Sequence, residues 1–109
     1  VTIYMHVTSN TISSAQTICN GASASTITGT SVGGGTGSYT YQWQSSTTSA
    51  TSGFSAATGT NSNTNYSPST PSVSTWYRRI ATSGFASDTT AALKITVNPA
   101  KHLPDPLLP

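Results

Sequence analysis

Two stretches decide the fold: YTYQWQSS at residues 39–46 and TWYRRIATSG at residues 75–84. In both, large and polar side chains alternate with the two-residue period of a β-strand. The chain between them, at residues 47–74, consists largely of Ser, Thr, Gly, Asn and Pro, which favour turns and loops. The pair therefore predicts two core strands of an antiparallel β-sandwich.

The aromatic side chains of the first stretch all fall on one face, and we expect that face to be inward. The second stretch leaves two inward faces open: Trp76, Arg78 and Ile80, or Tyr77, Arg79 and Ala81. In either case an arginine shares a face with core residues. We expect its stem to lie along apolar surface while its charged head stays in water.

Further strands are expected on both sides of this pair. AALKITVN at residues 91–98 predicts the last strand, and VTIYMHV at residues 1–7 predicts an extra N-terminal strand. The Asn20-Gly21 turn separates short strands within residues 11–18 and 24–30. The residues expected to form the core signature are Tyr41, Trp43, Trp76, Tyr77, Leu93, Ile95 and Val97.

These patterns predict an all-β fold, an immunoglobulin-like antiparallel β-sandwich of seven to eight strands. We divide the chain into an N-terminal strand or connector at residues 1–10, the sandwich at residues 11–99 and a Pro-rich tail at residues 100–109. The prolines of the tail exclude a helix or a central strand. We expect the tail to be extended, near polyproline II.

Composition narrows the class of protein. The chain has 109 residues, enough for one small domain, with 21 Thr and 19 Ser but only four Lys or Arg and two Asp or Glu. Such scattered charges attract nucleic acid weakly, so we expect no nucleic-acid partner. No apolar run is long enough for membrane insertion. A surface solvated by hydroxyl and amide groups favours a secreted, extracellular or cell-surface location.

Groups that could perform chemistry are scarce. Outside the terminal segments the chain has one acid, Asp88, and both histidines, His6 and His102, lie within those segments. Catalysis and metal binding need several such groups close together, so we expect no enzyme, no cofactor and no metal site. Cys19 is the one cysteine, and we expect it to be a small buried side chain rather than a reactive thiol.

Four motifs carry a family resemblance. They are QTICNG at residues 16–21, GTGSYTYQWQSS at 35–46, TWYRRIATSG at 75–84 and ITVNP at 95–99. Their order and spacing resemble the immunoglobulin-like or PKD-like repeats in very large cell-surface proteins of Bacteroidetes, including gliding-motility adhesins. The resemblance implies export by the type IX route and a role as one unit of an extracellular adhesin stalk or filament. It implies no catalytic residues.

Two further expectations follow from this resemblance. Asp88-Thr89-Thr90 fits the Asp-Ser/Thr-aliphatic-or-Thr pattern of Bacteroidetes O-glycosylation, which makes Thr89 a candidate for modification. In many such repeats a second cysteine follows the late Thr-Ser-Gly and could bridge back to the cysteine of the first motif. Here Phe85-Ala86 occupies that stretch, which puts the disulfide in doubt.

The ends of the chain predict how copies join. VTI at residues 1–3 resembles the closing ITV at residues 95–97, as if the chain began on the last strand of a preceding unit. A strand without a partner can add to the edge of a neighbouring copy, and head-to-tail repetition then builds a fibre. We therefore expect the junction between copies, in tandem or as a homopolymer, to use Val1, Ile3, Met5, Val7, Leu103, Leu107 and Leu108.

Surface glycans are the alternative partner. A carbohydrate-binding module would use the loop aromatics Phe54, Tyr66 and Phe85 as an exposed platform. Arg78 and Arg79 could then engage anionic glycans. The competing interpretation is that these arginines contact aromatic rings and the glutamines of the neighbouring strand.

Overall fold

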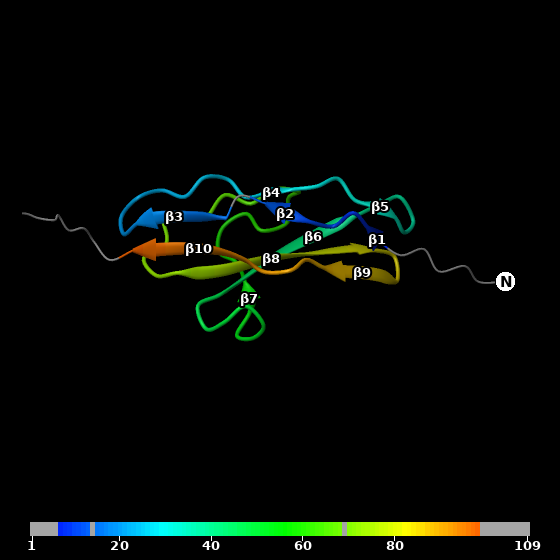
Figure 1. Cartoon of the computed structure of the whole chain (residues 1–109). Helices are drawn as coiled ribbons and strands as arrows, with labels where there is room; N and C mark the ends of the chain where they lie inside the picture. The colour runs from blue at the N-terminus through cyan, green and yellow to red at the C-terminus, as the bar shows by residue number, and fades with distance from the viewer. Residues whose placement is uncertain (1–6, 14, 69, 99–109) are drawn as a thin grey trace, which may run out of the picture.

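The computed structural model describes residues 7–13, 15–68 and 70–98. These residues form an all-β fold, as the sequence predicts, and contain no helix (Figure 1). The strands are β1 (Val7–Thr8), β2 (Ile12–Ser13), β3 (Gln16–Cys19), β4 (Thr28–Gly29), β5 (Gly33–Gly34), β6 (Thr40–Ser46), β7 (Ser55–Ala56), β8 (Thr75–Ser83), β9 (Ala86–Thr89) and β10 (Leu93–Asn98). Several have only two residues, so the described chain is divided more finely than the expected seven to eight strands.

The largest sheet is built around the two alternating stretches. β6 pairs antiparallel with β8 along its whole length, from Thr40 opposite Thr82 to Ser46 opposite Trp76. The strand order is β3-β10-β8-β6-β7, and β9 pairs with the C-terminal part of β8. The two stretches expected to be core strands are therefore strands, and they are neighbours in one sheet.

The pair β2–β4 covers the inner face of this sheet. Ile12 of β2 packs against the buried core cluster, and Ile27, which immediately precedes β4, belongs to that cluster. Ile27 also forms a bridge with Tyr66, with backbone N···O distances of 2.8 and 3.0 Å. The other small pair, β1–β5, lies further along the molecule (Figure 1).

One pairing departs from the expected antiparallel arrangement. β3 lies parallel to β10, with Gln16 opposite Ile95 and Cys19 opposite Asn98. A parallel pair needs a long connection, and residues 20–92 supply it. The expectation of purely antiparallel pairing is wrong here because alternation gives the faces of a strand but not the direction of its partner.

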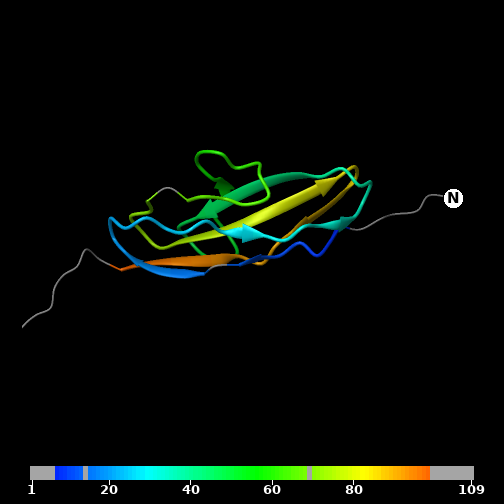
Figure 2. The ribbon, with the colours of Figure 1, turned by 90° about the horizontal axis from the view of Figure 1, so that it is seen from above.

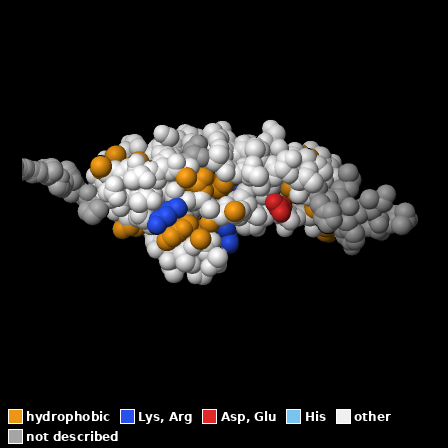
Figure 3. All heavy atoms as spheres, viewed as in Figure 1, with side chains coloured by type: hydrophobic (Ala, Val, Ile, Leu, Met, Phe, Trp, Pro, Cys, Tyr) orange, Lys and Arg blue, Asp and Glu red, His pale blue; other side chains and the backbone are white. Residues whose placement is uncertain are grey.

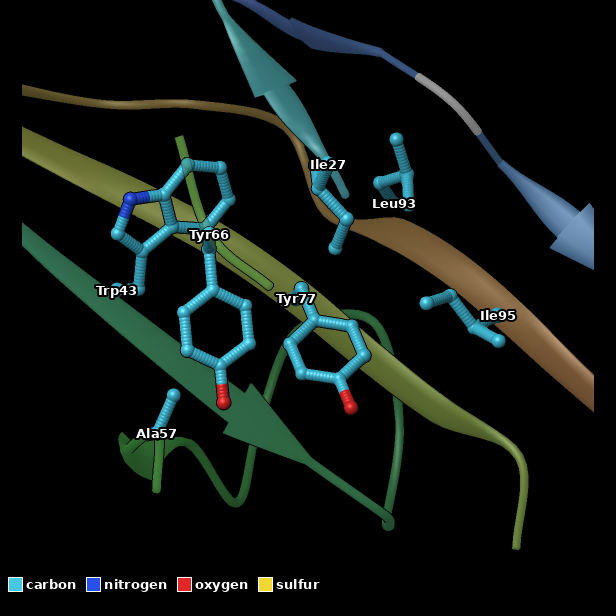
Figure 4. Close-up of a cluster of buried hydrophobic side chains, with 7 residues drawn as sticks. All are labelled: Ile27, Trp43, Ala57, Tyr66, Tyr77, Leu93 and Ile95. Atoms are coloured by element: carbon cyan, nitrogen blue, oxygen red, sulfur yellow. The ribbon is translucent and has the colours of Figure 1, made fainter. Parts of the chain in front are cut away.

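The core combines residues of the large sheet with residues from loops (Figure 4). The rings of Trp43 and Tyr66 stack with centroids 5.6 Å apart, and the ring of Tyr77 continues the row 5.5 Å from Tyr66. Leu93 and Ile95 complete the apolar face. The core signature is thus confirmed at Trp43, Tyr77, Leu93 and Ile95, whereas Tyr41, Trp76 and Val97 are half-buried.

The structure decides which face of β8 is inward. Tyr77, Arg79 and Ala81 are buried, while Trp76 and Ile80 are half-buried on the opposite face. Trp76 was expected in the core together with Tyr77, which the two-residue period of a strand forbids for adjacent residues. Trp76 is therefore corrected to the outer face of the large sheet.

The described chain enters and leaves the fold at opposite ends. In Figures 1 and 2, β1 lies at one end of the elongated fold and the C-terminal end of β10 lies at the other. The N-terminal run through β1, β2 and β3 crosses the length of the fold between them. We call the end that carries β1 the N-pole and the end where β10 finishes the C-pole.

Candidate functional site

The guanidinium of Arg79 makes four hydrogen bonds within the described part of the chain. It is fully buried on the inner face of β8. Its Nε and Nη2 donate to Asn10 Oδ1 at 3.0 and 2.8 Å, Nη1 donates to the Thr64 carbonyl at 2.9 Å, and Nη2 donates to the Thr30 carbonyl at 2.9 Å. The planar fork of a guanidinium suits such divergent acceptors. Arg79 therefore ties three separate segments to β8.

The charge of Arg79 is stabilised by dipoles rather than by a carboxylate in contact. The Tyr41 ring lies 4.7 Å from the guanidinium carbon, and Asn10 Nδ2 donates to Asp88 Oδ2 at 3.1 Å. Burial lowers the pKa of the Arg79 guanidinium from its usual value, yet an arginine stays protonated at neutral pH. The expectation that the arginine head on the inner face lies in water is wrong, because loop carbonyls replace the water.

Close packing around Arg79 also explains why residue 29, in β4, is a glycine. A Cβ on Gly29 would overlap Arg79 Nη1 and the Thr64 carbonyl oxygen. The backbone of β4 can approach the guanidinium only without a side chain at this position. Arg79 is thus a structural anchor, and its polar atoms are used within the domain.

The outer face of the large sheet presents two cation–aromatic pairs. The Arg78 guanidinium lies 4.1 Å from the Phe54 ring centroid, and its Nε donates to Gln44 Oε1 at 2.8 Å. The Lys94 ammonium lies 5.0 Å from the Trp76 ring centroid. Figure 3 shows hydrophobic side chains beside two cationic groups. We call these residues the outer patch; the predicted contact of an arginine with a ring and a glutamine is confirmed at Arg78.

The predicted aromatic platform of Phe54, Tyr66 and Phe85 does not form. Tyr66 is 2% exposed and belongs to the core, and its hydroxyl donates to the Thr58 carbonyl at 2.7 Å. Phe54 is half-buried against Arg78, whereas Phe85 is exposed on the turn between β8 and β9 at the N-pole. A ring enclosed between two other rings cannot stack on a sugar.

The two poles differ in what they expose. The N-pole carries Phe85 beside β1 and β5 (Figure 1). The C-pole carries Val73, which precedes β8, and Cys19, which ends β3 opposite Asn98. Among the residues that the structure describes, no three His, Cys, Asp or Glu side chains gather as a metal site would require.

Comparison with known protein families shows to which family the chain belongs. The profile of a family described as a domain of unknown function, DUF8696, matches residues 8–99. The chain belongs to the DUF8696 family. No curated protein and no solved structure matches it. The matched span covers almost all of the described strands and includes Asn10, the partner of Arg79.

The N-terminal boundary of the DUF8696 domain differs from the expected one. Residues 1–10 were assigned to a strand or connector, yet Asn10 is buried and Val7 is buried in β1, opposite Gly34 of β5. Sequence reasoning missed Asn10 because a single Asn after a Thr-Ser pair is an ordinary loop signal. Within the described residues, no helix has the length and apolarity of a membrane span.

The other predicted junction residues of this DUF8696 chain lie outside the described residues: Val1, Ile3, Met5, Leu103, Leu107 and Leu108. Val7 is the one junction candidate that is described, and its backbone already has a partner within the domain. Val7, the described part of the predicted free strand, therefore pairs with β5 of its own domain.

Two single-residue expectations for the DUF8696 domain can be placed. Thr89 is exposed at the end of β9, opposite Ile80, where a glycan has access. Cys19 is exposed and free, so the expectation that it is buried is wrong. Its position explains this, because β3 is an edge strand and Cys19 lies where β3 runs into a turn.

Proposed function

We propose that this domain is a structural module of an extracellular adhesin stalk or filament, joined to other copies end to end. The observation that carries the proposal is that the described chain enters at the N-pole and leaves at the C-pole. Modules joined through opposite poles add their lengths and extend the protein. Modules joined through one pole would fold back on each other.

The use of polar groups within the domain supports a structural role. The guanidinium of Arg79 donates to Asn10 and to two loop carbonyls. Asp88, the only acid of the described residues, accepts a hydrogen bond from Asn10. These polar groups therefore hold separate segments of the domain together. The immunoglobulin-like sandwich and the bacterial cell surface belong to the same proposal, which rests on the four sequence motifs.

Tandem joining fits the described strands better than donation of Val7 to a neighbour. Val7 lies opposite Gly34 within its own domain, so donating it would break an existing pair. Strand addition would have to use other residues or another edge, such as β3 or β7.

The proposal is tested on cells that produce the protein. Antibodies against the domain should label intact, non-permeabilised cells, and electron microscopy should place the label along extended surface structures. Labelling that requires permeabilised cells would contradict the extracellular location, and label confined to the membrane plane would contradict a stalk. Labelling with an antibody against a cytoplasmic protein controls for leakage.

The outer patch supports a second candidate, a carbohydrate-binding module for acidic polysaccharides. Arg78 and Lys94 carry positive charge beside the rings of Phe54 and Trp76, while Asp88 lies on β9. Rings can stack on sugar faces and the cations can pair with carboxylates. Affinity electrophoresis in a uronic-acid polysaccharide should retard the chain, and Trp76→Ala should restore its mobility. Equal retardation of Trp76→Ala and the control Phe85→Ala would reject this candidate.

A further inference from the structure

The described residues expose two large hydrophobic side chains, and these lie at opposite poles. Phe85 is 104% exposed and Val73 is 53% exposed. Phe85 sits in the β8–β9 turn at the N-pole, and Val73 precedes β8 at the C-pole (Figure 1). Single exposed hydrophobic residues are common, but their placement at the entry and the exit of the chain is specific.

Phe85 is presented by a rigid turn. Ser83 and Ala86 are paired, which leaves Gly84 and Phe85 as a two-residue hairpin loop. Gly84 has a φ of 62°, as the first central position of a tight hairpin turn requires. Such a turn holds the ring away from the domain, and the ring has no packing role within it. A polar residue would serve the turn equally well.

Val73 is held in place at the C-pole. The next residue, Ser74, accepts a hydrogen bond from the Val97 backbone N–H through its Oγ at 2.9 Å. Asn98 accepts from the Asn20 backbone N–H at 2.9 Å. The first bond fixes the segment of Val73 beside β10, and the second fixes the end of β3 there, where the described chain leaves the domain.

We propose that Phe85 of one module packs against the Val73-bearing C-pole of the module before it. The proposal rests on the proposed end-to-end function, and the occupant of each pole is a second copy of this chain. In an end-to-end array the C-pole of each module faces the N-pole of the next, so the two exposed hydrophobic side chains meet. The contact uses different surfaces on the two copies, so it repeats without closing.

The size of the contact defines its role. One ring against one valine falls far short of the roughly 1,000 Å² that a stable interface between free proteins needs. Free chains should therefore associate only near millimolar concentration. Covalent linkage supplies an effective concentration of about that size. In a tandem protein the contact would fix the angle between neighbouring modules rather than drive their assembly.

Cys19 makes the test direct, because it is an exposed and free thiol at the C-pole. A nitroxide on Cys19 of the full chain is mixed at roughly millimolar concentration with an isotope-labelled full chain that carries Cys19→Ser. The nitroxide should broaden the amide signals of residues 83–87 in the isotope-labelled chain. Phe85→Ser in the isotope-labelled chain, or Val73→Ser in the spin-labelled chain, should abolish that broadening.

Ala56→Ser provides the control, since Ala56 is exposed on β7 away from both poles, and it should leave the broadening unchanged. Broadening at residues 83–87 that persists in Phe85→Ser would overturn the role of Phe85 while leaving end-to-end contact intact. Broadening over β6 and β7, or none at all, would overturn the pole contact. If two covalently joined copies are nevertheless extended in solution, the proposed end-to-end function still holds although the contact between the poles does not form.

Discussion

Arg78 and Arg79 are neighbours in sequence and lie on opposite faces of one strand. Arg79 is fully buried, with hydrogen bonds to Asn10 and to the carbonyls of two loops. Arg78 is half-buried on the outer face, against Phe54 and Gln44. The same type of side chain therefore stabilises the fold on one face of β8, as Arg79, and remains accessible to solvent on the other, as Arg78. The comparison separates what holds this domain together from what it can offer to a partner.

The largest effect should come from Arg79→Met. The substitution leaves the buried Asn10 Oδ1 without its donor and removes the bonds to the Thr30 and Thr64 carbonyls, which should lower the free energy of unfolding by about 3–5 kcal/mol. Chemical denaturation measures the loss, and Arg78→Met is the matched control on the same strand. Equal losses in the two variants would remove the distinction between the faces.

Asn10→Ala should have the second largest effect. Its Oδ1 accepts from Arg79 Nε and Nη2, and its Nδ2 donates to the Asp88 carbonyl at 2.7 Å. Loss of these bonds should lower the free energy of unfolding by about 1–3 kcal/mol. Asn63→Ala, at an exposed loop position, should be near neutral. An unchanged free energy of unfolding in Asn10→Ala would contradict the assignment of Asn10 to the folded domain and would favour the original assignment of residues 1–10 to a connector.

Arg78→Met should change stability little. The pair with Phe54 is only half-buried, and such cation–aromatic contacts contribute about 1 kcal/mol or less. Thermal and chemical unfolding should therefore stay close to those of the wild type. The substitution should instead weaken retardation by an acidic polysaccharide, if the outer patch binds one. A loss as large as that of Arg79→Met would show that the outer face also carries the fold.

Tyr77→Phe should have the smallest effect at neutral pH. Burial, with a smaller contribution from Tyr66, raises the pKa of the Tyr77 phenol above its ordinary value of 10.0. The folded state thus favours the neutral phenol, so its contribution to stability is complete below pH 10 and is lost as pH rises through the raised pKa. Tyr77→Phe should reduce the alkaline loss of stability in pH-dependent unfolding, and Tyr39→Phe serves as the control. An unchanged pH profile in Tyr77→Phe would contradict this.

Alternation in the sequence was sufficient to predict the centre of the sheet. It identified β6 and β8 as strands of the core and placed Trp43, Leu93 and Ile95 in the core. It could not choose the inward face of β8, because both faces contain an arginine and large side chains. That choice depends on the loop carbonyls and Asn10 that satisfy Arg79, and these partners are far apart in sequence.

Contacts made by loops were the least predictable part of the fold and of the candidate site. Ile27 and Tyr66 are core residues, but no other large apolar side chain lies two residues away from either of them, so alternation does not mark them as core. The parallel partner of β3 was missed because a strand pattern carries no direction. The placement of Val73 and Phe85 at opposite poles also depends on the fold, since nothing in the sequence shows at which end of the molecule a given loop lies.

The central claim is that consecutive domains are joined end to end, the C-pole of one to the N-pole of the next. Small-angle X-ray scattering on two full chains joined in one polypeptide tests it most directly, with the single chain as the reference. The account predicts that the maximum dimension of the pair exceeds that of the single chain by nearly the length of one module. A pair with almost the same maximum dimension as the single chain, and a doubled cross-section, would show side-by-side packing and contradict the account.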